Sequence, residues 1–227
     1  MSYVIAAPGQ PAAEVKGTAD RFPVRRIFCV GRNYAAHARE MGNDDREPPF
    51  FFTKPADAVV ANGASVPYPP RTANFHHEVE LVVALAGGGA NIAAEKAKSL
   101  IYGYAVGIDL TRRDLQSDAR DHGRPWDVSK GFDRSAPLAA IRPVAAGGHI
   151  ERGRIWLTVN GKPKQDADIA DMTWKVPEII AELSTLFELA AGDLIFTGTP
   201  AGVGPLARGD TIEAGIDGLD TLTTRIV

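Results

Sequence analysis

The segment His77–Leu85 constrains the fold of this chain more strongly than any other part of its sequence. Its aliphatic and β-branched residues predict a strand, in which alternate side chains share a face. Glu78 and Glu80 therefore point the same way, and beyond Glu80 both faces of the strand are apolar. We expect this strand to enter the protein core, with the two carboxylates near its N-terminal end, where it enters.

Buried like charges repel each other and are neutralised or expelled unless a cation holds them. Asp109 repeats the pattern at the polar end of the apolar run Tyr104–Ile108. Together with Glu78 and Glu80 it offers hard oxygen ligands of the kind that suit Mg²⁺ or Mn²⁺. The spacing alone is equally compatible with acids on a solvated sheet edge. His76 shares the face of the two glutamates and is expected to line the pocket or to be exposed, with a fourth ligand as the alternative.

His37 and Glu40 form a second polar pair, on a helix that the sequence predicts from Tyr34 to Met41. Residues three apart lie on one face of a helix, so the two side chains can form a hydrogen bond. A carboxylate that holds one imidazole nitrogen leaves the other nitrogen as a general base near neutral pH. A pair of solvated surface side chains has the same spacing.

Two further places offer positive charge or backbone N–H groups to an anion. Lys130, between Ser129 and Gly131, can bring its charge to an oxyanion, although an isolated lysine is also typical of a solvated surface. The segment 197–204 has three glycines and two threonines in one turn region, which lets backbone N–H groups approach an anion closely. A tight connection between strands explains the same glycines.

Composition argues against several classes of protein. The net charge of −3 arises from interspersed acids and bases, which argues against a nucleic-acid-binding surface. No apolar run reaches the roughly 18 residues of a membrane span, and no signal peptide is visible. The single cysteine, Cys29, rules out an internal disulfide. These features predict a soluble cytoplasmic domain of the size of an enzyme, with neither nucleic acid nor membrane as a partner.

The order of the predicted elements favours an α+β, β-rich fold over a doubly wound sheet, because strands outnumber helices and do not alternate with them regularly. Asn160–Gly161 predicts a hairpin. Residues 1–21 are expected to form an extended lead-in and residues 22–227 a single catalytic domain. Strands are predicted over residues 26–30, 50–52, 77–85, 104–110, 155–159, 162–165, 193–197, 210–214 and 222–227. Further helices are predicted over residues 92–101, 112–119 and 177–189.

Five segments together resemble the fumarylacetoacetate hydrolase family, in its short single-domain branch. They are residues 29–34 (CVGRNY), 77–81 (HEVEL), 109–116 (DLTRRDLQ), 129–132 (SKGF) and 197–205 (TGTPAGVGP), and they stand in the order of the family. The likeness runs from about Arg26 to the end of the chain. The resemblance implies a mixed β-roll or β-sandwich core with flanking helices, in a homodimer, and Mg²⁺ or Mn²⁺ bound by Glu78, Glu80 and Asp109.

The same resemblance implies roles for other residues. His37 and Glu40 match the dyad that activates water, and Lys130 matches a lysine that stabilises an oxyanion. The family positions that contact substrate correspond to Arg113, Gln116 and Thr199. No matched catalytic position departs from the family pattern, which argues against a catalytically silent ligand-binding relative.

Within the branch, the chain resembles enzymes that hydrolyse fumarylpyruvate in bacterial gentisate catabolism, and it is also similar to hydrolases of other acylpyruvates. The implied reaction hydrolyses a carbon–carbon bond, so that fumarylpyruvate and water give fumarate and pyruvate. The alternative is a decarboxylase or isomerase of oxaloacetate or of ring-cleavage diacids, because the same metal–enolate chemistry supports those reactions.

Overall fold

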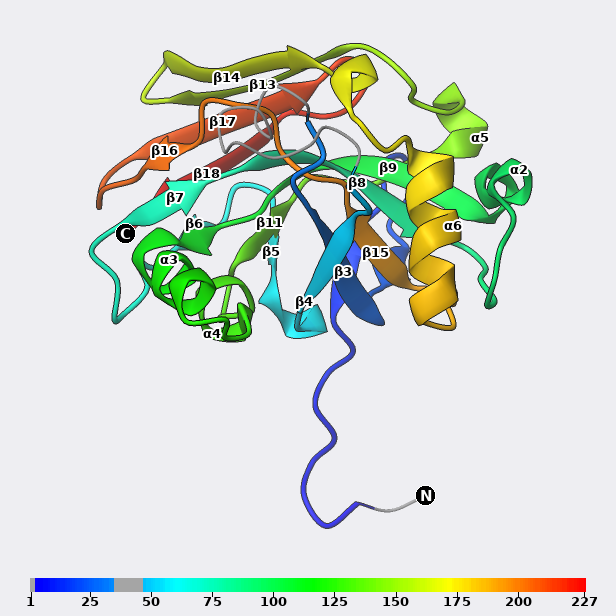
Figure 1. Cartoon of the computed structure of the whole chain (residues 1–227), viewed down its shortest axis with the longest axis horizontal. Helices are drawn as coiled ribbons and strands as arrows, with labels where there is room; N and C mark the ends of the chain where they lie inside the picture. The colour runs from blue at the N-terminus through cyan, green and yellow to red at the C-terminus, as the bar shows by residue number, and fades with distance from the viewer. Residues whose placement is uncertain (1–2, 35–46) are drawn as a thin grey trace.

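The structure of the protein is a computed structural model that describes residues 3–34 and 47–227. Its elements confirm the β-rich α+β fold expected from the sequence. An eight-stranded sheet and a five-stranded sheet lie one above the other, with helices around their periphery (Figure 1). The helix predicted from Tyr34 to Met41, with His37 and Glu40, falls almost entirely outside the described residues.

The larger sheet has eight strands among the described residues, in the order β4-β3-β15-β8-β9-β11-β5, with β12 paired to β9. These strands are β3 (Arg26–Gly31), β4 (Phe50–Lys54), β5 (Val59–Ala61), β8 (Val79–Leu85), β9 (Ile101–Ile108), β11 (Ala136–Leu138), β12 (Arg142–Pro143) and β15 (Asp193–Phe196). The sheet is mixed: β3 pairs in parallel with β15, and β5 with β11, whereas β8 is antiparallel to both of its neighbours. Strand β8, which contains Glu80 and directly follows Glu78, is therefore central, as expected for a strand that is apolar on both faces.

Three smaller sheets complete the β structure of the described chain. A five-stranded sheet, ordered β14-β13-β17-β18-β6, lies over the larger sheet (Figure 1). Its strands are β6 (Ser65–Val66), β13 (Arg154–Val159), β14 (Lys162–Asp168), β17 (Thr211–Ile216) and β18 (Leu222–Ile226). A three-stranded sheet joins β10 (Thr111–Arg112), β7 (Phe75–His77) and β16 (Gly204–Pro205), and a hairpin joins β1 (Ala12–Glu14) to β2 (Arg21–Pro23).

The described helices are short, apart from α3 and α6. They are α2 (Ala94–Ala97), α3 (Arg113–Asp121), α4 (Asp127–Lys130), α5 (Val144–Gly147) and α6 (Val176–Leu186), with 3₁₀ turns at Ala56–Ala58, Lys98–Leu100 and Ile169–Asp171. No helix among the described residues is long and apolar enough to cross a membrane.

Strand β8 separates two parts of the hydrophobic core. Leu81 and Val83 belong to a cluster that includes Leu157 of the five-stranded sheet and Ile179 of α6. On the opposite face, Val82 belongs to a second cluster, which includes the buried thiol of Cys29 in β3 and Phe196 in β15. Both faces of the strand beyond Glu80 are thus buried, as the sequence predicts.

The register of β8 against β9 brings the acidic residues together. Glu80 is opposite Gly107, and the N–H of Asp109 donates to the carbonyl of Glu78 at 2.8 Å. Gly107 has to be a glycine here, because a Cβ atom would lie 2.5 Å from Val82 Cγ2 and 2.7 Å from a ring carbon of Phe196. The face that carries the acids therefore continues into tightly packed core.

Several local predictions are confirmed, whereas the bounds of some elements differ, since α6 ends at Leu186, before the predicted end at residue 189. β13 and β14 form the predicted hairpin, and Asn160 and Gly161 have the positive φ values, 52° and 72°, that a type I′ turn requires. The helix predicted over residues 92–101 is shorter: α2 and a 3₁₀ turn end at Leu100. The reason is that Ile101 already pairs with Leu85 in the large sheet.

The N-terminal segment combines an extended part with a hairpin. Residues 3–9 run away from the sheets (Figure 1), whereas Gln10 and Pro11 form hydrogen bonds with Val24. From Ala12 onward the chain pairs with itself, and Ala13, Val15 and Phe22 are buried. The hairpin thus spans the boundary expected at residue 21, and the extent of the catalytic domain stays a prediction.

We expect Gly107→Ala to lower the free energy of unfolding by about 1–3 kcal/mol, because the added methyl group overpacks the core beneath the acids. Thermal unfolding followed by circular dichroism measures the effect as a lower Tm. Gly9→Ala is the matched control, since nothing lies within 4 Å of a Cβ atom at that position. An unchanged Tm for Gly107→Ala contradicts the packing argument.

Candidate metal centre

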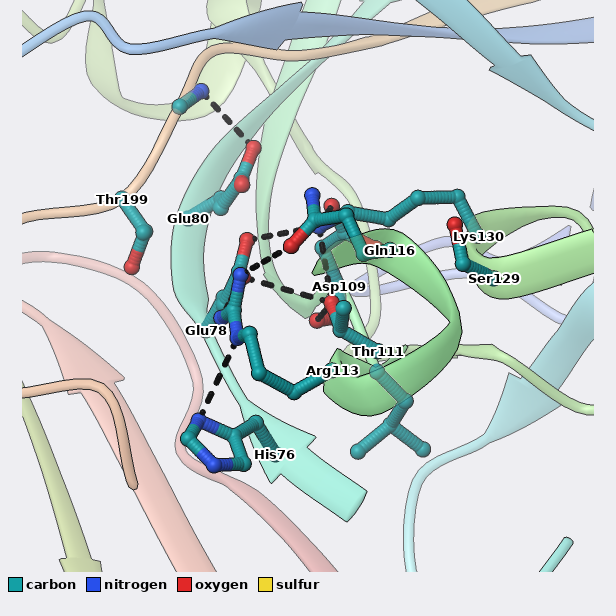
Figure 2. A network of polar contacts seen from close by, with 12 residues as sticks. His76, Glu78, Glu80, Asp109, Thr111, Arg113, Gln116, Ser129, Lys130 and Thr199 are labelled. Atoms are coloured by element: carbon teal, nitrogen blue, oxygen red, sulfur yellow. Dashed lines mark hydrogen bonds and ion pairs between the residues drawn. The ribbon is translucent and has the colours of Figure 1, made fainter. Parts of the chain in front are cut away.

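Three carboxylates from neighbouring strands meet in the interior of the protein. Glu78 lies between β7 and β8, Glu80 lies in β8, and Asp109 directly follows β9. One oxygen of each carboxylate lies within 4.8 Å of those of the other two, and all three residues are buried (Figure 2). We call these residues the carboxylate cluster. Its burial is the arrangement expected from the sequence and excludes the alternative of a solvated edge.

Lys130, at the end of α4, lies against this cluster. Its Nζ atom donates to Glu78 Oε2 at 2.8 Å, Asp109 Oδ2 at 2.6 Å and Thr111 Oγ1 at 2.7 Å. Burial by itself lowers the pKa of Lys130, but Asp109 and Glu78 outweigh it and raise the pKa above its usual value. An ammonium group has three N–H donors, and all three are used here. Lys130 therefore has to exchange one of these bonds before it can donate to a substrate oxygen.

A second buried lysine reaches the cluster, and sequence reasoning missed it. The side chain of Lys54, the last residue of β4, is fully buried, and its Nζ atom lies 2.8 Å from Asp109 Oδ1. The same ammonium group donates to the carbonyl of Leu110 at 3.1 Å and to that of Lys130. Lys54 thus ties β4 to both the cluster and α4. Its position depends on the pairing of β4 with β3, which no local pattern around Lys54 indicates.

Helix α3 places two of the predicted substrate-contacting residues beside the cluster. Arg113 donates to Glu78 Oε1 and to Gln116 Oε1, and its Nε atom lies 3.4 Å from His76 Nδ1 (Figure 2). His76 Nε2 bonds to Asn74 Oδ1 at 2.7 Å, so both ring nitrogens have partners. Burial and the nearby Arg113 lower the pKa of His76 to about 4. His76 therefore lines the pocket as a neutral residue, and it is not part of the carboxylate cluster.

The glycine-rich segment 197–204 contacts the cluster from the end of β15. The N–H of Gly198 donates to Glu80 Oε2 at 2.7 Å, so the anion that this loop binds is a carboxylate of the protein itself. Gly198 has φ of +94°, and a Cβ atom there would lie 2.7 Å from Asn33 Cβ. The Thr199 hydroxyl donates to the carbonyl of Val79 at 2.8 Å, which commits its proton to β8.

Gln165 is a further buried residue that the sequence did not point to. Its Nε2 atom donates to Thr199 Oγ1 at 2.8 Å, and its Oε1 atom accepts from the N–H of Val79 at 3.1 Å. The same Oε1 atom lies 3.1 Å from His77 Nδ1. Gln165 thereby fastens the glycine-rich segment and the start of β8 to the hairpin of the five-stranded sheet.

The carboxylates differ in how their charge is compensated. Burial alone raises the pKa of Glu78, but Lys130 and Arg113 outweigh it and hold that pKa well below its usual value. Glu80 forms no ion pair with any described lysine or arginine. Burial, followed by the charges of Asp109 and Glu78, raises the pKa of Glu80 well above its usual value. A divalent cation beside Glu80 would supply the missing positive charge, and an all-oxygen donor set suits Mg²⁺ or Mn²⁺. The residues present therefore fit a metal ion.

A cavity of about 280 Å³ opens beside the cluster. Its walls include acidic, basic and aromatic side chains, so that it can bind a polar organic molecule next to the cluster. Among the lining residues are Arg32, Phe52, His76, Glu78, Glu80, Arg113, Gln116, Arg120, Trp126, Lys130 and Thr199. All the predicted site residues that the structure describes thus lie in or against one cavity, whereas His37 and Glu40 lie outside the described residues.

Comparison with known proteins gives consistent matches. The family model described as "Fumarylacetoacetate (FAA) hydrolase C-terminal" matches residues 26–227. A fumarylpyruvate hydrolase of Ralstonia sp is 46% identical over 180 residues, which is 79% of this chain and 93% of the relative. An oxaloacetate tautomerase of Escherichia coli is 40% identical over 207 residues, covering 91% of this chain and 94% of the relative.

A solved structure matches over the whole chain. The crystal structure of fumarylpyruvate hydrolase from Pseudomonas aeruginosa in complex with Mn²⁺ and pyruvate has a TM-score of 0.97 and 50% sequence identity. The match covers 100% of this chain and 99% of that chain. The arrangement of sheets described above is thus that of a protein whose crystal structure contains a divalent metal ion.

We expect Glu80→Gln to weaken Mn²⁺ binding by more than about tenfold, because a neutral amide replaces the one cluster carboxylate that forms no ion pair with a described lysine or arginine. Isothermal titration calorimetry with MnCl₂ measures the change in Kd. Glu95→Gln, in an exposed position of α2, is the matched control and should bind Mn²⁺ like the parent protein. If Glu80→Gln binds Mn²⁺ as tightly as the parent, the cluster is not the metal site.

Asp114 gives a separate prediction about the helix that carries Arg113. Asp114 Oδ1 accepts from the Thr72 hydroxyl at 2.6 Å, and Oδ2 accepts from the N–H of Ala73 at 2.8 Å. Burial raises the pKa of Asp114, but these hydrogen bonds outweigh it and hold the pKa below its usual value. The ionised side chain therefore stabilises the folded state above the unfolded pKa of about 3.9, and this stabilisation is lost as the pH falls through the folded pKa.

Asp114→Asn should accordingly lower the Tm by a few degrees at pH 7, and the difference from the parent should narrow below about pH 4. Differential scanning calorimetry between pH 3 and pH 7 checks this. Asp118→Asn, on an exposed position of the same helix, changes the net charge equally and should shift the Tm less. A difference that stays constant with pH argues against a role for the Asp114 charge.

Proposed function

Because the chain belongs to the fumarylacetoacetate hydrolase family, we propose that it is a metal-dependent hydrolase that cleaves a carbon–carbon bond in an acylpyruvate. The proposed substrate is fumarylpyruvate, which water converts to fumarate and pyruvate. The observation that carries this proposal is the whole-chain likeness to a fumarylpyruvate hydrolase that was crystallised with Mn²⁺ and pyruvate. Pyruvate is a product of the proposed reaction.

The proposed metal ligands are Glu78, Glu80 and Asp109, which supply only carboxylate oxygens. When bound, the metal ion, Mn²⁺ or Mg²⁺, supplies a Lewis acid that stabilises negative charge on the oxygens of a 2-oxo acid. The protein's own residues have to bind and orient the substrate and move protons.

In the proposed mechanism, His37 is the general base and Glu40 orients its imidazole ring. His37 takes a proton from water, and the hydroxide adds to the carbonyl carbon of the acyl group, which is the carbonyl farther from the carboxylate of the 2-oxo acid. The carbon–carbon bond then breaks, so that the acyl group leaves as a carboxylic acid and pyruvate leaves as its enolate. Protonation of the enolate carbon completes the reaction and balances the proton taken from water. The roles of His37 and Glu40 rest on their sequence pattern.

Three described residues are proposed to contact the substrate from α3 and α4. Lys130 exchanges one of its three hydrogen bonds for the developing oxyanion, to which a well-placed donor contributes about 3–4 kcal/mol. Arg113 and Gln116 line the same cavity. Arg113 donates a hydrogen bond to Gln116, so the two side chains are positioned together for contact with the substrate. Thr199, in the glycine-rich segment, is proposed to contact the substrate as well.

A second function is favoured by a specific observation. The similarity to an oxaloacetate tautomerase extends over almost the whole chain, and that reaction also requires an enolate of a 2-oxo acid. The carboxylate cluster suits both reactions equally. Whether the protein is a hydrolase or a tautomerase therefore depends on whether water attacks a second carbonyl group of the substrate.

The compartment, the oligomeric state and the pathway of the enzyme are part of the same proposal. We propose that it acts in the cytoplasm as a homodimer and consumes the product of an aromatic-ring-opening pathway, as in gentisate catabolism. Analytical ultracentrifugation tests the dimer, and genes for a ring-cleaving dioxygenase beside its own gene would support the pathway.

A panel of four substrates with added Mn²⁺ or Mg²⁺ tests the proposed function. We expect fumarylpyruvate to be consumed faster than acetylpyruvate, fumarylacetoacetate and oxaloacetate, as measured by ultraviolet absorbance and by product analysis. Faster conversion of oxaloacetate, with no hydrolysis of fumarylpyruvate, would establish the second function instead.

His37→Ala separates the water-activating role from metal binding. We expect this variant to lose about 10²–10⁴-fold in kcat for hydrolysis, the usual contribution of a general base, while its Kd for Mn²⁺ is unchanged. His122→Ala, at an exposed histidine after α3, is the matched control and should keep the parent rate. Near-normal hydrolysis by His37→Ala would show that another group activates water.

A further inference from the structure

Among the described residues, three arginines line the cavity beside the carboxylate cluster, and they differ in their ion-pair partners. Arg113 is held by Glu78, and Arg120 pairs with Asp121 at 3.0 Å. Arg32 lines the same cavity, and no carboxylate of the described residues pairs with it. Its guanidinium carbon lies 5.7 Å from the centre of the Phe50 ring. Of the three, Arg32 is thus the arginine whose charge has no acidic partner within the described chain.

The backbone fixes Arg32 at this place. Its φ of 58° lies in the left-handed region, which residues with a side chain seldom adopt and which is associated with functional sites. The preceding Gly31 packs directly against Phe50, since a Cβ atom there would lie 2.1 Å from the ring. The following Asn33 is fully buried, and its side chain bonds to the backbone of Trp174 and of Thr197. Arg32 is therefore held between two immobilised neighbours.

The sheet sets the distance between Arg32 and the metal ligands. β15 lies between β3 and β8, and Phe196 is opposite both Cys29 and Val82. Arg32 follows β3, so its Cα atom lies about two strand spacings, or roughly 10 Å, across the sheet from that of Glu80 in β8. Arg32, Glu78 and Glu80 line the same cavity, so a dicarboxylate with one end at the cluster can direct its other end toward the guanidinium group.

We infer that Arg32 is a specificity-determining residue that binds the far carboxylate of a dicarboxylic 2-oxo acid. Arginine suits this role because its planar guanidinium group binds a carboxylate through two parallel hydrogen bonds. The inference rests on the proposed function for the reacting end of the substrate, and it adds the group that recognises the other end. A substrate without the far carboxylate gains nothing from Arg32.

A matched pair of ligands tests this recognition without catalysis. 2-Oxopimelate and 2-oxoheptanoate have the same chain length and the same 2-oxo acid head, but only 2-oxopimelate has a far carboxylate. Neither has the second carbonyl group that the proposed hydrolysis requires. Their Kd values for the Mn²⁺-loaded protein, measured by calorimetry, should show that the parent binds 2-oxopimelate more tightly.

Arg32→Gln should weaken binding of 2-oxopimelate by roughly tenfold to a hundredfold, the usual effect of losing a hydrogen bond to a charged group. Its affinity for 2-oxoheptanoate should stay within about threefold of the parent value. Arg32→Lys should restore part of the preference, because it keeps the charge. Arg134→Gln is the matched control, since Arg134 is exposed and has a similar φ of 59°. It should leave both affinities unchanged.

Three results overturn the assignment. An equal loss of affinity for both ligands in Arg32→Gln shows that Arg32 acts on the common head group or on the fold. No preference in the parent protein shows that the far carboxylate is not recognised. Loss of the preference in Arg120→Gln, with Arg32→Gln unaffected, assigns the carboxylate to Arg120. Failure of the proposed function is distinguishable, because fumarylpyruvate then stays uncleaved while the effect of Arg32→Gln on 2-oxopimelate persists.

Discussion

The ammonium group of Lys130 contacts carboxylates from two different places in the large sheet, and that of Lys54 contacts one of the same carboxylates from β4. Ionised groups in a protein interior are costly unless they are paired and hydrogen-bonded. The buried acids at the adjoining ends of β8 and β9 therefore require these cations, and the segments that carry the lysines have to lie beside them. This requirement explains why β4 and α4, which are far from β8 in sequence, converge on the end of β8.

The compensation is incomplete at Glu80, and this defines the chemical character of the site. Glu78 and Asp109 each have cationic partners, whereas Glu80 accepts a hydrogen bond from Gly198 and has no ion pair among the described side chains. Burial, and after it the charges of Asp109 and Glu78, raises the pKa of Glu80, and a divalent cation at the cluster would favour its ionised form. The same cluster suits several reactions of 2-oxo acids. Selectivity among them has to come from the rest of the cavity, as expected where one fold hosts several activities.

Sequence patterns predicted the acids well and their partners poorly, for a physical reason. The two-residue repeat of a strand places Glu78 and Glu80 on one face, so their shared orientation follows from local sequence, whereas their burial is settled only by the neighbouring strands and helices. The contact of Lys54 with Asp109 depends on how β4 pairs with β3, which is a long-range property of the sheet. Likewise, the glycines of segment 197–204 indicate an anion-binding loop, but not that the anion is Glu80. The dyad of His37 and Glu40 stays a prediction.

The buried thiol of Cys29 has a practical consequence for work on this protein. Burial, and after it the negative charge of Asp109, raises the pKa of this thiol well above its usual value, so the reactive thiolate is suppressed in the folded state. Cys29 is also the only cysteine in the chain. A thiol reagent therefore reacts only with molecules in which the larger sheet has opened at β3. The rate of labelling becomes a native reporter of how often the sheet beneath the carboxylates opens, with no added probe.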